Sequence, residues 1–181
     1  MIELALADAR AWCHGHIIDD RPALAHALQV ATTLDAHVSC APPLVCAALL
    51  HDSPLFAPAD IDLNAFLTDR YGPEVTRIIR ALEAQHEALD SADPPVLVDD
   101  QPVLLASTAD KIVALSSLLR RARASGDVDA FFRARGPLLR LLPYFRAYQQ
   151  AGAPLVPQRM AAKLRSVIER IDQATELARR G

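Results

Sequence analysis

The sequence predicts an all-α fold, a helical bundle, and three observations carry that prediction. Its 181 residues are 51% hydrophobic, and this apolar content is mainly Ala and Leu, which favour helix over strand. Apolar residues recur at helical spacing in several segments. Turn-forming Pro, Gly and Asp residues separate those segments. The length fits one domain over residues 1–181, with a core over about 4–150 and a C-terminal helix over about 157–180.

Turn residues divide the first part of the chain into helical segments. Residues 3–14 are expected to form a first helix, and the polar turn at 19–22 ends it and opens a second helix over 23–35. Two prolines then introduce the nearly all-apolar segment 44–50, whose Ala and Leu content favours a buried helix over a buried strand. Residues 53–62 contain two further prolines and are expected to form a loop.

The middle of the chain is expected to form two shorter helices and one long one. A helix over 63–71 is separated by Gly-Pro from another over about 74–89. The acidic, Pro-rich stretch 90–101 is predicted to be a surface loop. A long helix over 103–125 follows this loop.

Two more helices complete the expected bundle. The first covers about 128–150, and Pro137 and Pro143 are expected to kink or divide it. The second covers about 157–180 and has an apolar side. We expect that side to pack on its own domain, with a second subunit as the alternative.

Composition and charge exclude several classes of partner. The formal net charge of −3 offers no basic excess for a nucleic acid. No apolar run reaches the roughly 18 residues that suggest a membrane span, and the N-terminus lacks the pattern of a signal peptide. We therefore expect a cytoplasmic protein that binds neither nucleic acid nor membrane. Cys13, Cys40 and Cys46 form no CxxC pair and are expected to be structural thiols.

The strongest chemical signal is the pair His51-Asp52 at the end of a buried apolar segment. A buried carboxylate without a partner is very costly, and a metal ion is one such partner, although an ordinary polar helix end is the alternative. His26 lies earlier on an amphipathic helix. Asp110 lies inside a later apolar helix, where the alternative is a surface ion pair with Lys111 or another cation. Imidazole and carboxylate together suit Mn, Fe, Co, Ni or Zn.

Five segments, in this order, resemble one known family. They are AHALQVA at 25–31, AALLHD at 47–52, YGPEV at 71–75, ADKIVAL at 109–115 and the Tyr144-Phe145 pair. The pattern is that of the HD-domain superfamily of metal-dependent phosphohydrolases. More narrowly, the chain is similar to the RelA/SpoT hydrolase domain and to small alarmone hydrolases, so the resemblance implies an HD-domain helical bundle.

The resemblance implies removal of pyrophosphate from the 3′ position of a guanosine alarmone. The family's four metal ligands correspond to His26, His51, Asp52 and Asp110, with Mn foremost and Fe, Co, Ni or Zn as alternatives. In that chemistry the metal activates a water and polarises the phosphoryl oxygen. Asp52 is thereby also a catalytic candidate, and Tyr144 is a candidate wall of the nucleotide pocket, with a packing role as its alternative.

The chain departs from the family at positions that handle the reaction. Leu55 and Phe56 occupy the places of a Glu-Asp pair, and neither side chain can exchange a proton. Ala114 occupies the place of an Asn. The nearest replacement acids are Asp60 and Asp62, for which helix capping and loop solubility are the alternative.

Besides Tyr144, the substrate-binding candidates are His14, His16 and Lys111. The segment that holds the two histidines is acidic where the family is basic, and a solvated or locally hydrogen-bonded His is the alternative. Together these features predict a metal-dependent phosphohydrolase that acts on a small phosphorylated substrate, a nucleotide or related phosphate ester. The alternatives are a catalytically impaired HD protein that binds a nucleotide or a partner, and a helical scaffold without metal.

Overall fold

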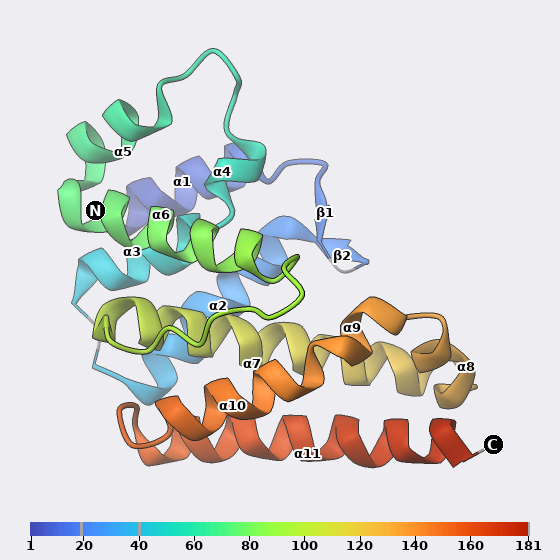
Figure 1. The fold of residues 1–181 in the computed structure, drawn as a ribbon. Helices are drawn as coiled ribbons and strands as arrows, with labels where there is room; N and C mark the ends of the chain where they lie inside the picture. The colour runs from blue at the N-terminus through green and yellow to red at the C-terminus, as the bar shows by residue number, and fades with distance from the viewer. Residues whose placement is uncertain (19, 40, 181) are drawn as a thin grey trace.

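Helices dominate this computed structural model, which confirms the all-α class (Figure 1). The structure describes residues 1–18, 20–39 and 41–180, with side chains up to Glu176. In this part of the chain the elements are α1 Ile2–Trp12, β1 Ile17–Ile18, β2 Arg21–Pro22, α2 Ala23–His37, α3 Pro42–Leu50, α4 Ser53–Phe56, α5 Leu63–Tyr71, α6 Pro73–Ala88, α7 Gln101–Ala124, α8 Val128–Arg133, α9 Gly136–Arg140, α10 Leu142–Gly152 and α11 Gln158–Arg180.

Helix α7 is the centre of the bundle. It packs against α2, α3 and α6 on one side and against α11 on the other, as Figure 1 shows for the yellow helix. Sixteen of its 24 residues are buried. By length and composition alone α7 could cross a membrane, although Asp110 and Lys111 interrupt its apolar sequence. In this fold 83% of its most apolar window is buried inside the protein, as a core helix requires.

Helix α3 confirms that the apolar segment before His51 is a buried helix. Pro42 and Pro43 occupy its first positions, where a missing backbone N–H costs nothing. Almost every later residue is buried, because α1, α2, α6 and α7 surround the helix. His51-Asp52 therefore emerges from the interior of the bundle rather than from its surface.

The segment 53–62 is not entirely a loop, which corrects the sequence prediction. Its first four residues form the short helix α4, directly after Asp52. Pro54 favours a loop when the sequence alone is considered, yet proline is well tolerated in the first turn of a helix. The rest of the segment ends at Asp62, whose Oδ1 accepts a hydrogen bond of 3.1 Å from the backbone N–H of Ala65. The predicted cap of α5 is thus confirmed at Asp62.

Prolines divide the segment 128–150, as predicted. Pro137 and Pro143 lie in the first turns of α9 and α10, so that α8, α9 and α10 replace one continuous helix. Helix α11 packs on α7, α8 and α10, which confirms that its apolar side covers its own chain.

The polar turn after α1 holds a two-stranded hairpin, which the sequence did not predict. Strands β1 and β2 pair antiparallel around a turn in which Asp20 has a φ of 58°. Cys13 and Cys46 are buried free thiols, as expected, and Cys40 lies outside the described residues.

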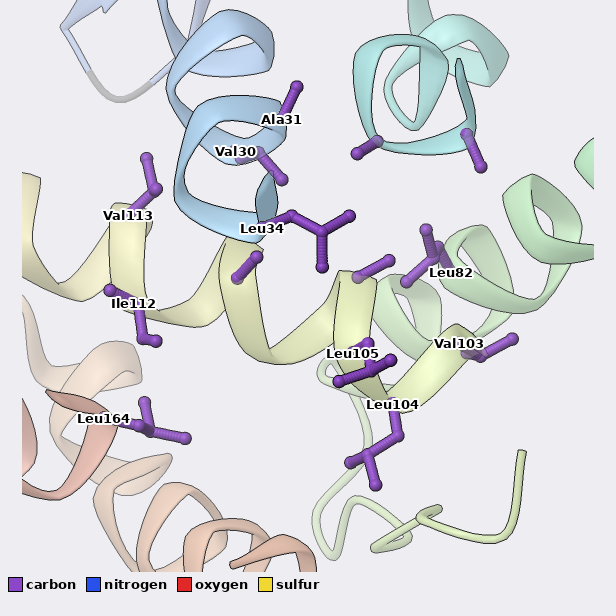
Figure 2. Close-up of a cluster of buried hydrophobic side chains, with 14 of the residues drawn as sticks. Val30, Ala31, Leu34, Leu82, Val103, Leu104, Leu105, Ile112, Val113 and Leu164 are labelled. Carbon is purple, nitrogen blue, oxygen red and sulfur yellow. The ribbon is translucent and has the colours of Figure 1, made fainter. Parts of the chain in front are cut away.

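Removal of buried volume between α2 and α7 should destabilise the bundle. Leu34 is fully buried and extends from α2 toward α7 (Figure 2). We expect Leu34→Ala to lower the free energy of unfolding by about 2–5 kcal/mol, because it removes apolar contacts and leaves a cavity. Urea denaturation measures this change. Leu28 is 36% exposed on the same helix, and Leu28→Ala should cost less than about 1 kcal/mol; equal costs would contradict the packing described.

Candidate metal centre

Three helices bring two histidines and an aspartate together. His26 lies on α2, His51 directly follows α3 and Asp110 lies on α7, and all three are buried. The Nε2 atoms of the histidines are 3.2 Å apart, and Oδ1 of Asp110 is 3.0 Å from Nε2 of His26. One ligand atom from each residue lies within 4.8 Å of the others. This buried His-His-Asp group could hold a metal ion.

Asp52 lies at the edge of the same group. Its Oδ2 atom is 3.3 Å from Nε2 of His51 and 3.9 Å from Nε2 of His26. That oxygen is buried and has no hydrogen-bond partner among the described residues. An unpaired buried carboxylate oxygen is costly, and a cation would satisfy it. Neighbouring ligands of a metal with bonds of about 2.0–2.2 Å lie about 3 Å apart. The spacing of the His26, His51 and Asp110 atoms fits a divalent ion, and the Asp52 oxygen lies beside them.

Asp110 is held as a carboxylate in the core of the bundle. Burial alone would raise its pKa, but hydrogen bonds from His26 and His86, with the charge of His86, hold the pKa well below its ordinary value of 3.8. Nε2 of His86 lies 3.0 Å from Oδ2 of Asp110. Burial lowers the pKa of His86, yet its hydrogen bond to Asp110 and the Asp110 charge outweigh burial and raise it overall.

The second ring nitrogens of the two histidines have different partners. Nδ1 of His51 lies 2.8 Å from the carbonyl oxygen of Ala48, which only accepts, so this nitrogen carries a hydrogen and Nε2 offers a lone pair. Nδ1 of His26 lies 2.9 Å from Nη2 of Arg21, which only donates. In the neutral ring the hydrogen of His26 is therefore on Nε2, facing Asp110. A metal ion bound at Nε2 would require that hydrogen to move to Nδ1, where Arg21 donates. The hydrogen bond from Arg21 therefore opposes metal binding.

A cavity of about 300 Å³ opens beside this group. His26, Asp52 and Asp110 line it, together with residues of α6, α7, α9 and α10. The lining residues are Ile18, His26, Asp52, Leu55, His86, Leu89, Asp110, Lys111, Ala114, Leu115, Leu118, Arg121, Leu138 and Phe145. A small molecule bound in this space would contact the candidate metal ligands directly.

Two of the substrate-binding candidates are buried near the cavity. Lys111 lines it, but its Nζ donates a hydrogen bond of 2.7 Å to Oγ of Ser107 and lies 4.4 Å from the ring centre of Tyr148. Burial lowers the pKa of Lys111 to about 8, although Asp110 acts in the opposite direction. Tyr144 packs against Phe145 and Tyr148, and its neighbour Phe145 provides the aromatic ring that lines the cavity.

The other candidates lie outside the cavity lining. His14 and His16 are exposed, and the His16 ring stacks on Phe56 with ring centres 4.5 Å apart. Asp60 is exposed, and Asp62 caps α5. The geometry brings neither acid to the His-His-Asp group, so their catalytic role stays a prediction.

Sequence reasoning missed His86 and Arg21 as neighbours of the site. His86 follows the buried Leu82 by one helical turn on α6, and a histidine on such an apolar stripe was an available signal. Arg21 had no comparable signal, because its contact with His26 depends on how β2 meets α2.

The fold and the site define an all-helical protein with a buried His-His-Asp group that could hold a metal ion. No protein-family model matches the chain, and no curated protein matches it.

Substitutions of the group should weaken metal binding in a graded way. Asp110→Asn should lower Mn affinity by at least about 100-fold, more than the loss of a residue that only orients a ligand. His86→Gln should lower it by about 10–100-fold, because His86 orients the Asp110 carboxylate. Calorimetric titration measures both. Asp35→Asn, which changes an exposed carboxylate on α2, is the matched control. An Mn affinity that Asp110→Asn leaves unchanged would contradict the assignment.

Removal of the Arg21 donor should strengthen metal binding. Arg21→Met should raise Mn affinity about 10-fold, because a hydrogen bond from a charged group is worth about 1.5–3 kcal/mol and here holds the opposing tautomer of His26. The same titration measures this change in affinity. Arg123→Met, which removes an exposed arginine of α7, is the control for the lost positive charge. A weaker affinity in Arg21→Met would refute the tautomer argument.

Proposed function

We propose that the chain is an HD-type, metal-dependent phosphohydrolase that acts on a small phosphate ester. The observation that carries the proposal is the buried oxygen of Asp52, which lacks a hydrogen-bond partner in the described structure beside the His26, His51 and Asp110 group. The ordered resemblance to RelA/SpoT hydrolase domains supports phosphate chemistry and makes Mn the first candidate ion. Nucleotides are the substrate class that this resemblance suggests.

The four proposed ligands have distinct tasks. His51 offers Nε2 in the correct tautomer, since Ala48 accepts from its other nitrogen. Asp110 supplies a carboxylate whose second oxygen stays on His86. Asp52 supplies the buried oxygen that has no hydrogen-bond partner among the described residues. When bound, the metal would act as a Lewis acid on the phosphoryl group and lower the pKa of a coordinated water.

His86 is the proposed replacement for the missing acid pair. Its ring lines the cavity, whereas Asp60 and Asp62 do not. Its Nε2 donates a hydrogen bond to Oδ2 of Asp110, which is one of the proposed ligands. A side chain in that place can hold or release a proton beside a phosphoryl group.

A second candidate function is binding without turnover. Leu55 lines the cavity at 70% exposure, and Phe56 stacks on His16, so neither position offers a carboxylate to the site. A catalytically impaired HD protein would retain ligand and metal while it lacked hydrolysis. Calorimetry with phosphate esters, read beside product release, separates the two functions.

The phosphohydrolase proposal predicts Mn-dependent release of phosphate or pyrophosphate. Purified protein with added Mn should release it from at least one member of a panel of nucleotides, the guanosine alarmone and simple phosphate esters. Asp52→Asn and His51→Ala should reduce the rate by at least about 100-fold, because each removes a ligand of the ion that activates water. Colorimetric phosphate detection measures the rates.

Two further variants sharpen this experiment. Asp35→Asn should keep the wild-type rate, because this exposed carboxylate lies outside the cavity lining. His86→Gln should lower the rate, whereas Asp60→Asn should leave it unchanged if His86 replaces the acid pair. A panel on which wild type and Asp52→Asn are equally inert would overturn the hydrolase function.

A further inference from the structure

The cavity beside the candidate metal centre is apolar beyond its metal-facing wall. Leu115 and Leu118 of α7 line it, together with Leu138 and Phe145 from the two helices on the opposite side. Ala114, in the place where the resembling family has an Asn, adds a methyl group instead of an amide. The space therefore favours a hydrocarbon group.

The polar side chains of the cavity are already engaged. His26, Asp52, His86 and Asp110 belong to the proposed metal centre. The Lys111 ammonium donates to Ser107.

Arg121, at the far side of the lining, is also engaged. It forms an ion pair of 2.5 Å with Asp20 of the hairpin turn. A purine base presents several donors and acceptors along its edges. The two polar lining side chains outside the metal centre, Lys111 and Arg121, already have partners, so a buried purine would lose hydrogen bonds to water that they could replace only by giving up those partners.

Three further lining residues are apolar. Ile18 of the hairpin, Leu55 of α4 and Leu89 after α6 all line the cavity. Leu55 is 70% exposed. A hydrocarbon bound against Leu55 would cover apolar surface that water now contacts.

From this geometry we infer that the cavity takes a phosphate monoester whose esterified group is apolar, a short alkyl or aryl group rather than a nucleoside. The inference rests on the proposed function for the phosphate end. The cavity volume of about 300 Å³ is at the small end of ligand pockets and suits a group of that size. The phosphate would lie at the metal centre and the hydrocarbon against Leu118 and Phe145.

The reaction that follows is simple hydrolysis. The oxygen of a water molecule forms a new bond to phosphorus, and the bond between phosphorus and the ester oxygen breaks. One proton of that water passes to the departing oxygen. The products are an apolar alcohol or phenol and inorganic phosphate.

The test compares stable phosphonates in binding and the matching esters in turnover. Hexylphosphonate, methylphosphonate and guanosine 5′-monophosphate are titrated calorimetrically into the full chain with Mn. Hexylphosphonate should bind at least about 10-fold more tightly than either of the others, because only it fills the apolar space. Hexyl phosphate and guanosine 5′-monophosphate are then compared as substrates, and the hexyl ester should have the higher kcat/KM.

Two variants locate the hydrocarbon. Ala114→Leu fills the cavity and should lower hexylphosphonate affinity at least about 10-fold while methylphosphonate and Mn binding stay within about 2-fold. Leu118→Gln should also lower the affinity for hexylphosphonate at least about 10-fold. Leu97→Gln, at an exposed leucine outside the lining, is the control and should change nothing. Thermal unfolding of each variant checks that it is folded.

The outcomes distinguish this inference from the proposed function. Tight hexylphosphonate binding that Ala114→Leu abolishes, with no ester hydrolysed, would support the apolar cavity and overturn the hydrolase. Hydrolysis of guanosine 5′-monophosphate in preference to hexyl phosphate would support the hydrolase and overturn the apolar cavity. Hexylphosphonate binding that is unaffected by both cavity variants would also overturn it.

Discussion

The structure depends on one buried charge, the Asp110 carboxylate in the central helix α7. A carboxylate at 8% exposure is stable only with hydrogen-bond donors or cations around it. His26 and His86 meet its two oxygens from α2 and α6, and His51 approaches from the end of α3. The partners of this charge therefore come from α2, from α6 and from the residue after α3, all of which pack against α7. The same convergence creates a set of nitrogen and oxygen atoms at the spacing that a divalent ion needs.

The candidate centre and the cavity are two consequences of the same helix. Successive turns of α7 present Asp110 first, then Ala114 and Leu118, so a charged wall passes directly into an apolar one. This arrangement separates the task of holding an ion from the task of choosing a ligand. Leu55 is compatible with this arrangement, because most of the other residues that line the cavity are also apolar.

Local patterns predicted most of the helices because those patterns act over a few residues. Pro42-Pro43 before an Ala and Leu segment, Asp62 before α5 and the prolines that separate α8 from α9 and α10 act within one or two helical turns. The errors fell where two rules compete. Pro54 can mark a loop or open a helix, and the second outcome prevailed at α4 because the chain leaves α3 already in a helical conformation at His51.

The sequence by itself determined the helical class, because that class depends on residue type and on the spacing of apolar residues. It also singled out His26, His51-Asp52 and Asp110, because these polar residues lie in or beside apolar helical segments. Tertiary structure decided which groups meet these residues. The contact of His86 with Asp110 joins α6 and α7, whose relative placement no local pattern specifies. The cavity was decided in the same way, since its walls come from β1, α7, α9 and α10 and exist only when those elements pack together.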